Sequence, residues 1–448
     1  MSGMITVQGS GHNGIIPIPS DFPGSINGLL DAYLAGLAGS IAGGTAGFEN
    51  GDDDDHKKHG DHDDKRHDNN GRGNDDKHHD GKDGDSTSGS YTVNSSWNTV
   101  IVDTPGNMTL QGNGVTKVAL FGAYSNVNYS DTNGGSASAA DSIFAAGGND
   151  SITTYSTTNT GSSYAIYSAG NDTVHLDNQG TDTVVATSNA HTDVIISAGT
   201  ATVMATDNSS VWVKDYSSGK LDFINNSSNA ATVYASNSTN GMALNSVTAF
   251  GGAGGGYYVG GLAGSNSLVG GTGTVTLVGA GNNDFLQANS AYGTNLLEGG
   301  SGSETLIGGT ASGSNMFEVG MNGGVTNGVV STEGSGIQTF LIGSTNSSTV
   351  TGSSVMGALN VYDVVRDSAT QANGPATLTI TDFTSNSVLF ITDTTPGAGH
   401  VSITAMGTEL GGGGTEILLS DNTKIYLTGV SANSLVTSTD PHGTIRIT

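Results

Sequence analysis

The chain is poor in cysteine, in cationic residues and in long apolar runs, and each shortage excludes a class of protein. Its 448 residues include no Cys, 7 Pro and 13 Lys or Arg, against 40 Asp or Glu, so the formal net charge is −27. Without cysteine there is no disulfide scaffold and no thiol nucleophile. The negative charge opposes contact with phosphate backbones, so we expect no nucleic-acid partner. No apolar run reaches the roughly 20 residues of a membrane-spanning helix, so we expect no membrane span.

Glycine is in excess, and the charge is unevenly distributed. The 71 glycines are about 16% of the chain, roughly twice the usual share. Collagen is excluded, because it needs Gly at every third position together with abundant Pro. Residues 51–85 hold 13 Asp, 7 Lys or Arg and 6 His, so the other 413 residues hold six basic and 27 acidic side chains. The body is therefore built mainly from Gly, Ser, Thr, Asn, Ala and Val.

Composition divides the chain into four regions: 1–49, 50–90, 91–345 and 346–448. In the first region, residues 25–41 are predicted to form a short helix that caps the body or packs on a neighbour. Its apolar side chains recur at helical spacing, and Ser25 is a plausible N-cap. No basic segment precedes it, so we do not expect a Sec signal peptide. The apolar positions are Ile26, Leu29, Leu30, Tyr33, Leu34, Leu37 and Ile41.

Residues 50–90 form an acidic, His-rich linker that we expect to be disordered. Asp, His, Lys, Asn and Gly bury too little apolar area to offset the loss of chain entropy on folding. A second interpretation is weak binding of divalent metal through its histidines. These are His56, His59, His62, His67, His78 and His79.

From about residue 91 the chain reads as short β-strands separated by Gly, Asn and Ser. Runs such as 99–102, 194–196 and 211–213 are three to six residues long, with turn residues about every ten positions. In the run Val-Trp-Val-Lys at 211–214, alternation predicts that Trp212 and Lys214 share one side of a strand. From 346 to 448 the strands are predicted to be longer, and the repeat fades.

One small motif recurs: Gly, any residue, an acid or amide, any residue, then an aliphatic residue or Phe. It occurs at 148–152, 170–174, 180–184, 293–297, 302–306 and 313–317. Such a unit buries one inward side chain, and stacking of successive units builds a narrow core. Two steps of about ten residues would make one coil of a parallel β-roll. The glycine is expected to make the tight turn, and the polar residue to face it. We therefore predict an all-β fold, a parallel β-roll or β-solenoid.

These motifs resemble those of the RTX family of Gly- and Asp-rich, calcium-binding β-roll proteins. The segment Gly-Gly-Ser-Gly-Ser-Glu-Thr-Leu-Ile at 299–307 follows the family nonapeptide, with Glu in place of Asp. The resemblance implies Ca²⁺ held by carboxylates and turn carbonyls of consecutive coils. The alternative is that the acids and amides only form hydrogen-bonded turn ladders. The candidate metal ligands are Asp150, Asp172, Asp182, Asp193, Asp284 and Glu304.

The resemblance extends to the C-terminal region. Ile-Thr-Asp-Phe at 380–383 and Leu-Thr-Gly-Val at 427–430 are similar to segments that follow RTX arrays and accompany an uncleaved type I secretion signal. What this implies is a secreted or cell-surface bacterial protein, and the lack of cysteine agrees with that expectation.

No catalytic signature stands out, so we expect no enzymatic activity. The sequence lacks His-Glu-x-x-His, Gly-x-Ser-x-Gly and Walker A motifs. The expected function is that of an extracellular structural protein: an adhesin, a biofilm-matrix component or a self-assembling surface layer or fibre. The alternatives are a β-helical polysaccharide-modifying enzyme and a carbohydrate-binding module. Aromatic residues that could contact an extracellular polysaccharide, or else stack in the core, are Tyr124, Tyr129, Tyr155, Tyr164, Tyr167, Tyr257 and Tyr258.

Overall fold

The computed structural model describes the chain from residue 149 to 448 with short gaps, and strands alone before residue 149. The gaps are 156–161, 188, 236–245, 263–264, 290–292, 301, 311, 321–325, 344–346, 367–375, 394–400 and 409–412. The predicted helix at 25–41 and nearly all of the predicted linker at 50–90 lie outside the described residues. Only 88–90, which open a strand, are an exception. Among described residues no helix is long and apolar enough to cross a membrane.

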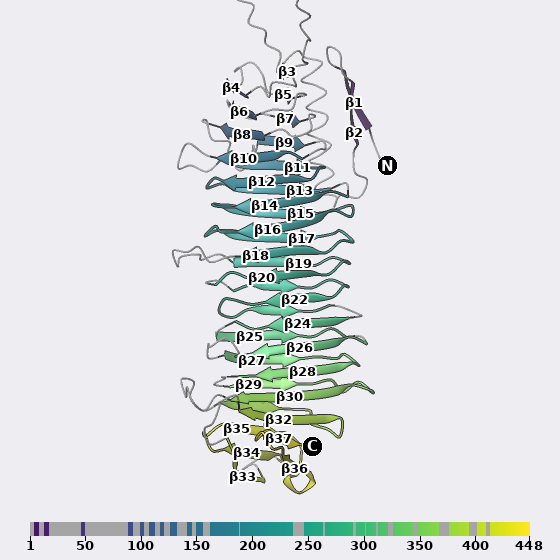
Figure 1. Ribbon diagram of the computed structural model, residues 1–448, viewed down its shortest axis with the longest axis vertical. Coiled ribbons are helices and arrows are strands. Elements are labelled where there is room, and N and C mark those ends of the chain that lie inside the picture. The colour runs from purple at the N-terminus through teal and green to yellow at the C-terminus, as the bar shows by residue number, and fades with distance from the viewer. Residues whose placement is uncertain are drawn as a thin grey trace, which may run out of the picture.

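Two parallel sheets run the length of the molecule and face each other across its core (Figure 1). Sheet 1 contains β3 (Ala46–Glu49), β5 (Thr99–Val102), β7 (Lys117–Leu120), β9 (Asp141–Ala145), β11 (Tyr164–Ser168), β13 (Thr181–Ala186), β15 (Thr200–Ala205), β17 (Lys220–Asn225), β19 (Ser246–Phe250), β21 (Ser267–Val269), β23 (Phe285–Gln287), β25 (Gly302–Ile307), β27 (Thr326–Ser331), β29 (Ser348–Thr351) and β31 (Thr377–Ile380).

Sheet 2 is formed by the alternate strands of the chain. It contains β4 (Ser88–Thr92), β6 (Asn107–Gly112), β8 (Asn126–Asp131), β10 (Ser151–Tyr155), β12 (Asp172–Asp177), β14 (His191–Ile196), β16 (Ser210–Asp215), β18 (Ala231–Ala235), β20 (Gly256–Val259), β22 (Val275–Val278), β24 (Thr294–Glu298), β26 (Ser314–Val319), β28 (Ile337–Ile342), β30 (Leu359–Arg366) and β32 (Ser387–Asp393). A separate antiparallel pair is formed by β1 (Met4–Gln8) and β2 (Asn13–Pro17).

Each coil of the chain contributes one strand to each sheet. Val174 in β12 pairs with Val194 in β14, and Val194 pairs with Val213 in β16, so one coil takes about 20 residues. This confirms the predicted parallel solenoid of two ten-residue steps per coil. The parallel pairing continues past residue 345, because β28 pairs with β30 and β30 with β32.

The core is narrow and is built from the inward side chains of each strand. In sheet 2 it runs through Val174, Val194, Val213 and Val233, and all four are fully buried. The inward side chains of successive coils stack on one another, as expected for a solenoid. Near the C-terminal end the column becomes aromatic. The rings of Phe317, Phe340 and Tyr362 are stacked with centroids 4.9 Å apart at each step.

Glycine is required at the corners of the coils for two different reasons, a left-handed φ and a close approach between coils. At Gly302 the backbone has a φ of +88°, which residues with a Cβ rarely adopt, so the predicted turn role holds there. Gly180 does not have a left-handed φ. A Cβ at this position would lie 1.8 Å from the carbonyl oxygen of Ser162 on the preceding coil, so close approach between coils requires glycine.

One row on the outer face of sheet 1 is buried over four consecutive strands. Phe144, Tyr167, Val185 and Met204 are paired in register, and each follows an inward residue, so each points away from the core. All four are nevertheless less than a tenth exposed. Farther along the same row, Phe250 in β19 is 47% exposed. This outer row of sheet 1 is therefore strongly exposed only beyond these strands.

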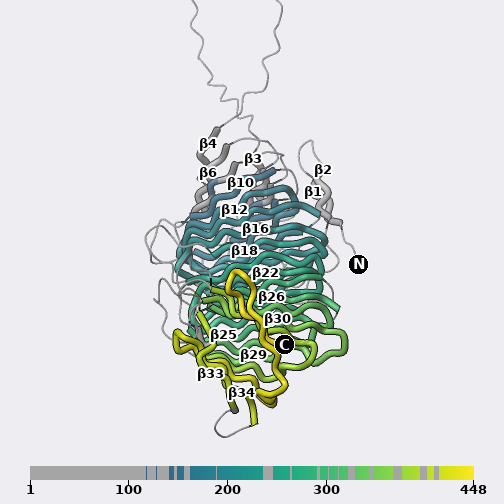
Figure 2. The backbone as a smooth tube through the Cα atoms, turned by 60° about the horizontal axis from the view of Figure 1, so that its bottom comes forward, coloured from purple at the N-terminus to yellow at the C-terminus, as the bar shows by residue number. Residues whose placement is uncertain are grey.

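The parallel coils give way to antiparallel strands at the C-terminal end (Figure 2). In sheet 1, β35 (Lys424–Leu427) pairs with β31, and β34 (Thr415–Leu419) and β33 (Ile403–Thr408) follow in antiparallel order. In sheet 2, β37 (Ile445–Ile447) pairs with β32 and with β36 (Thr437–Thr439). A 3-10 turn, η1, spans Ala432–Ser434.

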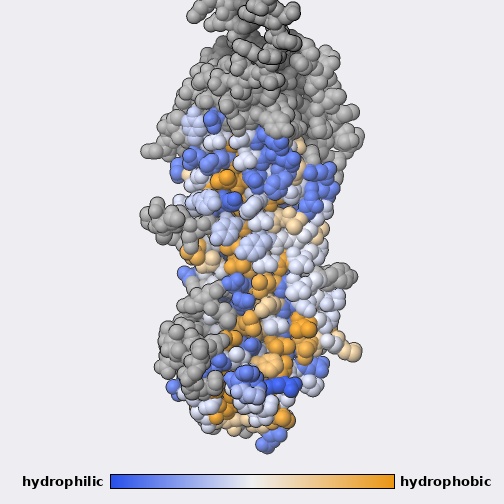
Figure 3. Space-filling model, in the orientation of Figure 1, coloured by the Kyte–Doolittle hydropathy of each residue, from blue (hydrophilic) through white to orange (hydrophobic). Residues whose placement is uncertain are grey.

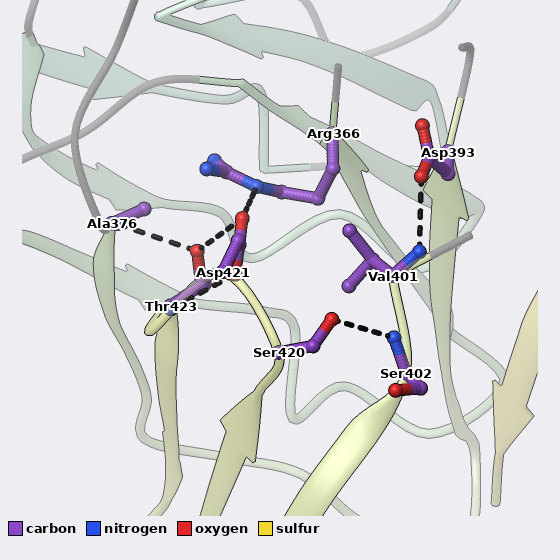
Figure 4. Close-up of polar contacts among 8 residues, drawn as sticks. All are labelled: Arg366, Ala376, Asp393, Val401, Ser402, Ser420, Asp421 and Thr423. Carbon is purple, nitrogen blue, oxygen red and sulfur yellow. Dashed lines mark hydrogen bonds and ion pairs between the residues drawn. The ribbon is translucent and has the colours of Figure 1, made fainter. Parts of the chain in front are cut away.

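An ion pair in a polar network joins this terminal unit to the last coils (Figure 4). The Arg366 Nε donates to Asp421 Oδ2 over 2.7 Å, and both side chains are largely buried. The Asp421 carboxylate also accepts from the backbone nitrogen and the hydroxyl of Thr423. A buried ion pair with additional hydrogen bonds fixes orientation, because breaking it would leave an uncompensated charge.

Candidate functional site

A polar side chain precedes the core residue by two positions in many coils, and it points inward. These side chains, which we call the ladder residues, are buried. They occupy the acid or amide position of the sequence motif, so the repeat marks an interior position beside the corner. In sheet 2 they include Asp150, Asp172, Asn295, Asn315, Gln338 and Asn360, and in sheet 1 Asp182, Asn266, Asp284 and Glu304.

Asp172 shows how an acidic ladder residue is held. Its Oδ1 accepts a hydrogen bond from the backbone nitrogen of Asp150 on the preceding coil, at 2.9 Å. Its Oδ2 accepts from the Ser168 hydroxyl at 2.7 Å and from the Gly170 nitrogen at 3.3 Å. Burial raises the pKa of Asp172, and these hydrogen bonds oppose that shift. The carboxylate therefore ties one corner to the coil before it.

Asp182 has the same role in sheet 1. Its Oδ1 accepts from the backbone nitrogen of Tyr164 at 2.9 Å, and its Oδ2 accepts from the Asn178 amide at 2.8 Å. Burial raises the pKa of Asp182 to about 7, although both hydrogen bonds favour the charged form.

Asp284 and Glu304 lie on neighbouring coils of sheet 1 and form a stacked carboxyl pair. Glu304 Oε2 accepts from the Asp284 backbone nitrogen at 3.0 Å, and Asn266 donates to Asp284 Oδ1 from both its backbone and its amide. Glu304 is 2% exposed, and its Oε1 has no hydrogen-bond partner among described residues. Burial, and then the charge of Asp284, raise the pKa of Glu304 to about 8.

Amides occupy the ladder positions of sheet 2 in the same part of the rod. The Asn295 amide donates to Asn315 Oδ1 at 2.9 Å, and the Asn315 amide donates to Gln338 Oε1 at 2.7 Å. The Asn315 oxygen also accepts from the Gly309 nitrogen. Because an amide both donates and accepts, each side chain can bond to the next without a charge.

Three of the candidate ligands, Asp172, Asp182 and Asp284, are held differently from the calcium ligands that the RTX resemblance implies. Ca²⁺ takes six to eight oxygen ligands. In the described ranges no group of three or more His, Cys, Asp or Glu is arranged to hold a metal. Both carboxylate oxygens of Asp172, of Asp182 and of Asp284 already accept hydrogen bonds from the protein. For these three acids the geometry fits the hydrogen-bonded ladder, the alternative left open by the sequence.

The sixth candidate ligand, Asp193, is not a ladder residue. It lies on the outer face of β14, where its carboxylate contacts His191 Nε2 at 3.0 Å, and both side chains are nearly half exposed. The structure thus brings Asp150 beside Asp172 and Asp284 beside Glu304. It leaves Asp182 in the opposite sheet from the first pair and Asp193 outside the core.

The tyrosines considered for carbohydrate contact divide between core and surface. Tyr164, Tyr167 and Tyr258 are buried, so they are unavailable to an extended ligand, which corrects that interpretation for these three. Tyr257 is exposed on the outer face of β20, and Tyr155 is partly exposed on β10. The side chains of Tyr124 and Tyr129 lie outside the described residues.

Three further exposed aromatic residues, Trp212, Tyr216 and Tyr234, were not singled out as ligand contacts from the sequence. Trp212, Tyr216, Tyr234 and Tyr257 are each 42–43% exposed on the outer side of sheet 2 or at its edge. Strand alternation was the available signal, because Val211 and Val213 are buried and so place Trp212 outside. Lys214 Nζ lies 4.2 Å from the centre of the Trp212 ring, a cation–π contact that orients the indole.

A polar groove of about 710 Å³ lies at the corners of the same coils. Its lining includes Thr206, Asn208, Asn225, Ser227 and Thr272, which lie at or near the corners where the chain passes from a strand of sheet 1 to the next strand of sheet 2. Hydroxyl and amide side chains form part of this lining, so the groove can exchange hydrogen bonds with a polar ligand.

No family model, curated protein or solved structure matches this chain. The resemblance to RTX proteins therefore rests on the sequence motifs, and the fold on the strand pairing described above.

Proposed function

We propose that this protein is an extracellular structural protein without enzymatic activity, an adhesin or matrix component exported by a type I system. The observation that carries the proposal is the long parallel solenoid, in which inward side chains from Ile143 to Ile391 belong to one continuous core. A fold of this kind supplies a long, stiff support with repeated outer positions. The RTX-like motifs and the lack of cysteine support export and an extracellular location.

Self-association is the second part of the proposal. The outermost strands of the two sheets at the C-terminal end, β33 and β36, are largely exposed. An exposed strand edge presents unpaired N–H and C=O groups that can pair with another chain. Two copies could therefore join through these edges into an oligomer or a fibre.

Fractionation of a bacterium that produces the tagged full-length chain tests export. With a functional type I exporter we expect the protein in the medium or on the cell surface, and without it in the cytoplasm. Cytoplasmic retention in both strains would contradict the proposed location. Electron microscopy of the purified protein tests assembly, where rods joined into oligomers or filaments are expected. If the rods stay single at high concentration, only the self-association part of the proposal is contradicted.

A further inference from the structure

The outer face of sheet 2 carries a row in which aromatic rings and threonine hydroxyls alternate. Strand register aligns Trp212 of β16 with Thr232 of β18, Thr232 with Tyr257 of β20, and Tyr257 with Thr276 of β22. The two rings are exposed, and the two threonines are partly exposed between and beside them. Figure 3 shows one face of the rod, on which hydrophobic and hydrophilic side chains are closely mixed.

The spacing of this row follows from the sheet. Neighbouring strands are about 4.8 Å apart, so Trp212 and Tyr257, two strands apart, are separated by roughly 9.6 Å along the rod. Tyr234 lies diagonally between them on β18, within reach of large side chains across strands. Trp212, Tyr234 and Tyr257, which we call the aromatic platform, thus form a zigzag across three consecutive coils.

We propose that the aromatic platform binds a neutral, extended polysaccharide that lies along the rod axis. A sugar ring has an apolar face of C–H groups and an edge of hydroxyls. Indole and phenol rings offer an apolar body with a polar tip, which suits the apolar face. The threonine hydroxyls beside the rings can exchange hydrogen bonds with the hydroxyls at the edge of the sugar. The distance between Trp212 and Tyr257 is close to the length of two linked sugar rings.

The charges around the platform decide which polysaccharide it accepts. Asp193 pairs in register with Trp212 and is exposed, and its carboxylate can accept hydrogen bonds from sugar hydroxyls. Outside residues 51–85 the chain has 27 acidic and six basic side chains, and Lys214 is the cation that contacts the platform. An anionic polymer would be repelled by this surface, whereas a neutral one would not.

The platform is too small and too polar for a stable protein interface of its own. Such interfaces bury about 800 Å² on each partner around an apolar centre. Here three rings are interrupted by Thr232 and bordered by Asp193, Lys214 and Thr276. Beside them the polar groove runs along the corners of the same coils. These features favour a hydroxyl-rich chain over a second copy of the protein.

Binding of the purified full-length protein to suspensions of cellulose and chitin tests the inference, with alginate as the anionic comparison. We expect cosedimentation with at least one neutral polymer and none with alginate. The double variant Trp212→Ala, Tyr257→Ala is expected to weaken binding by about tenfold or more. Phe250→Ala removes an equally exposed ring from sheet 1 and is the matched control. Circular dichroism checks that each variant is folded.

A second measurement uses the two tryptophans of the chain. In a Trp97→Phe background the fluorescence reports Trp212 alone, and soluble cello- or chito-oligosaccharides should shift or quench it in a saturable way. The inference is overturned if neutral polymers are not bound, if the double variant binds as well as the unsubstituted protein, or if Phe250→Ala weakens binding equally. Loss of self-association in the double variant without any glycan would show that the platform joins copies instead.

The inference rests on the proposed extracellular location, yet the two can fail separately. If the protein is exported and assembles but does not bind neutral glycans, the proposed structural role stands and the proposed glycan binding by the aromatic platform is wrong. If the purified protein binds glycan, but the tagged protein stays in the cytoplasm of both strains, the glycan binding stands and the proposed location is wrong.

Discussion

Two ladders occupy the same part of the rod on opposite sheets, and they differ in charge. In sheet 2, Asn295, Asn315 and Gln338 pass hydrogen bonds from one side chain to the next. In sheet 1, Asp284 and Glu304 can only accept while charged, so each takes a backbone N–H, and Glu304 Oε1 has no hydrogen-bond partner in the described part of the chain. The amide ladder should therefore be indifferent to pH, while the carboxyl pair should carry a proton that leaves as the pH rises.

The largest effect is expected from Asn315→Asp, which puts a carboxylate into the amide ladder. The new side chain would face Gln338 Oε1 without a proton to donate, and its charge would be buried. We expect the free energy of unfolding at pH 8 to fall by about 3 kcal/mol, with partial recovery at pH 5. Urea unfolding at the two pH values measures this. Asn386→Asp, on an exposed turn, is the control, and an equal loss there would refute the ladder's importance.

Glu304→Gln makes the opposite exchange and should stabilise the protein at alkaline pH. The pKa of Glu304 is raised from 4.5 to about 8 in the folded state, so the folded protein holds the proton more tightly than the unfolded chain. Its contribution is fully present below pH 4.5 and is lost as the pH rises through about 8. We expect the variant to be more stable by about 2 kcal/mol at pH 9 and nearly equal at pH 4.

The control for this exchange is Glu416→Gln on β34, which changes the net charge equally. Parallel stability–pH curves for the unsubstituted protein and the Glu304 variant would show that the carboxyl pair holds no extra proton.

A smaller effect is expected from Phe340→Leu in the core of sheet 2. The ring of Phe340 is stacked between those of Phe317 and Tyr362, whereas the facing column of sheet 1 is aliphatic. Loss of the ring contacts and of some volume should cost about 1.5 kcal/mol. Thermal unfolding compares this variant with Val361→Ala on the outer face, which should change little. If both variants lose equal stability, the aromatic stack does not stabilise the core on the sheet 2 side.

The smallest expected effect is that of calcium on the carboxyl pair. Because the oxygens of Asp284 accept N–H groups and no metal-binding cluster is formed among described residues, millimolar Ca²⁺ should not replace the proton of Glu304. The difference in melting temperature between the unsubstituted protein and Glu304→Gln at pH 8 should therefore be the same with Ca²⁺ and with a chelator. If this difference in melting temperature disappears in Ca²⁺ but not in the chelator, a cation binds at the carboxyl pair and the prediction is wrong.

Part of the candidate site could be predicted from the sequence. The motif places Asp172 two residues before Val174 and Glu304 two residues before Leu306, and the structure buries both acids beside the corner. Asp193 stands one residue before Val194, which puts it on the opposite side of the strand. The spacing therefore already predicted that Asp193 does not belong to the ladder. Thr192 occupies the inward position instead.

The outer face was harder to predict, since two adjacent tyrosines cannot share one side of a strand. Tyr258 pairs with Val233 and Leu277 and points inward, which leaves Tyr257 outside. The flanking glycines of this short strand give no alternation that would settle the choice in advance. Which aromatic rings face solvent depends on the register with the coils on either side.

The sequence by itself determined the coil of about 20 residues and the inward positions within each strand, because turn glycines and a side-chain period of two are local properties. Tertiary structure decided which residues meet between coils. Asp284 stacks on Glu304, and Trp212 aligns with Thr232 and Tyr257, only because the corners bring successive strands into one register. Register is a property of neighbouring coils, so the proton-holding pair and the aromatic platform emerge only when the coils are stacked.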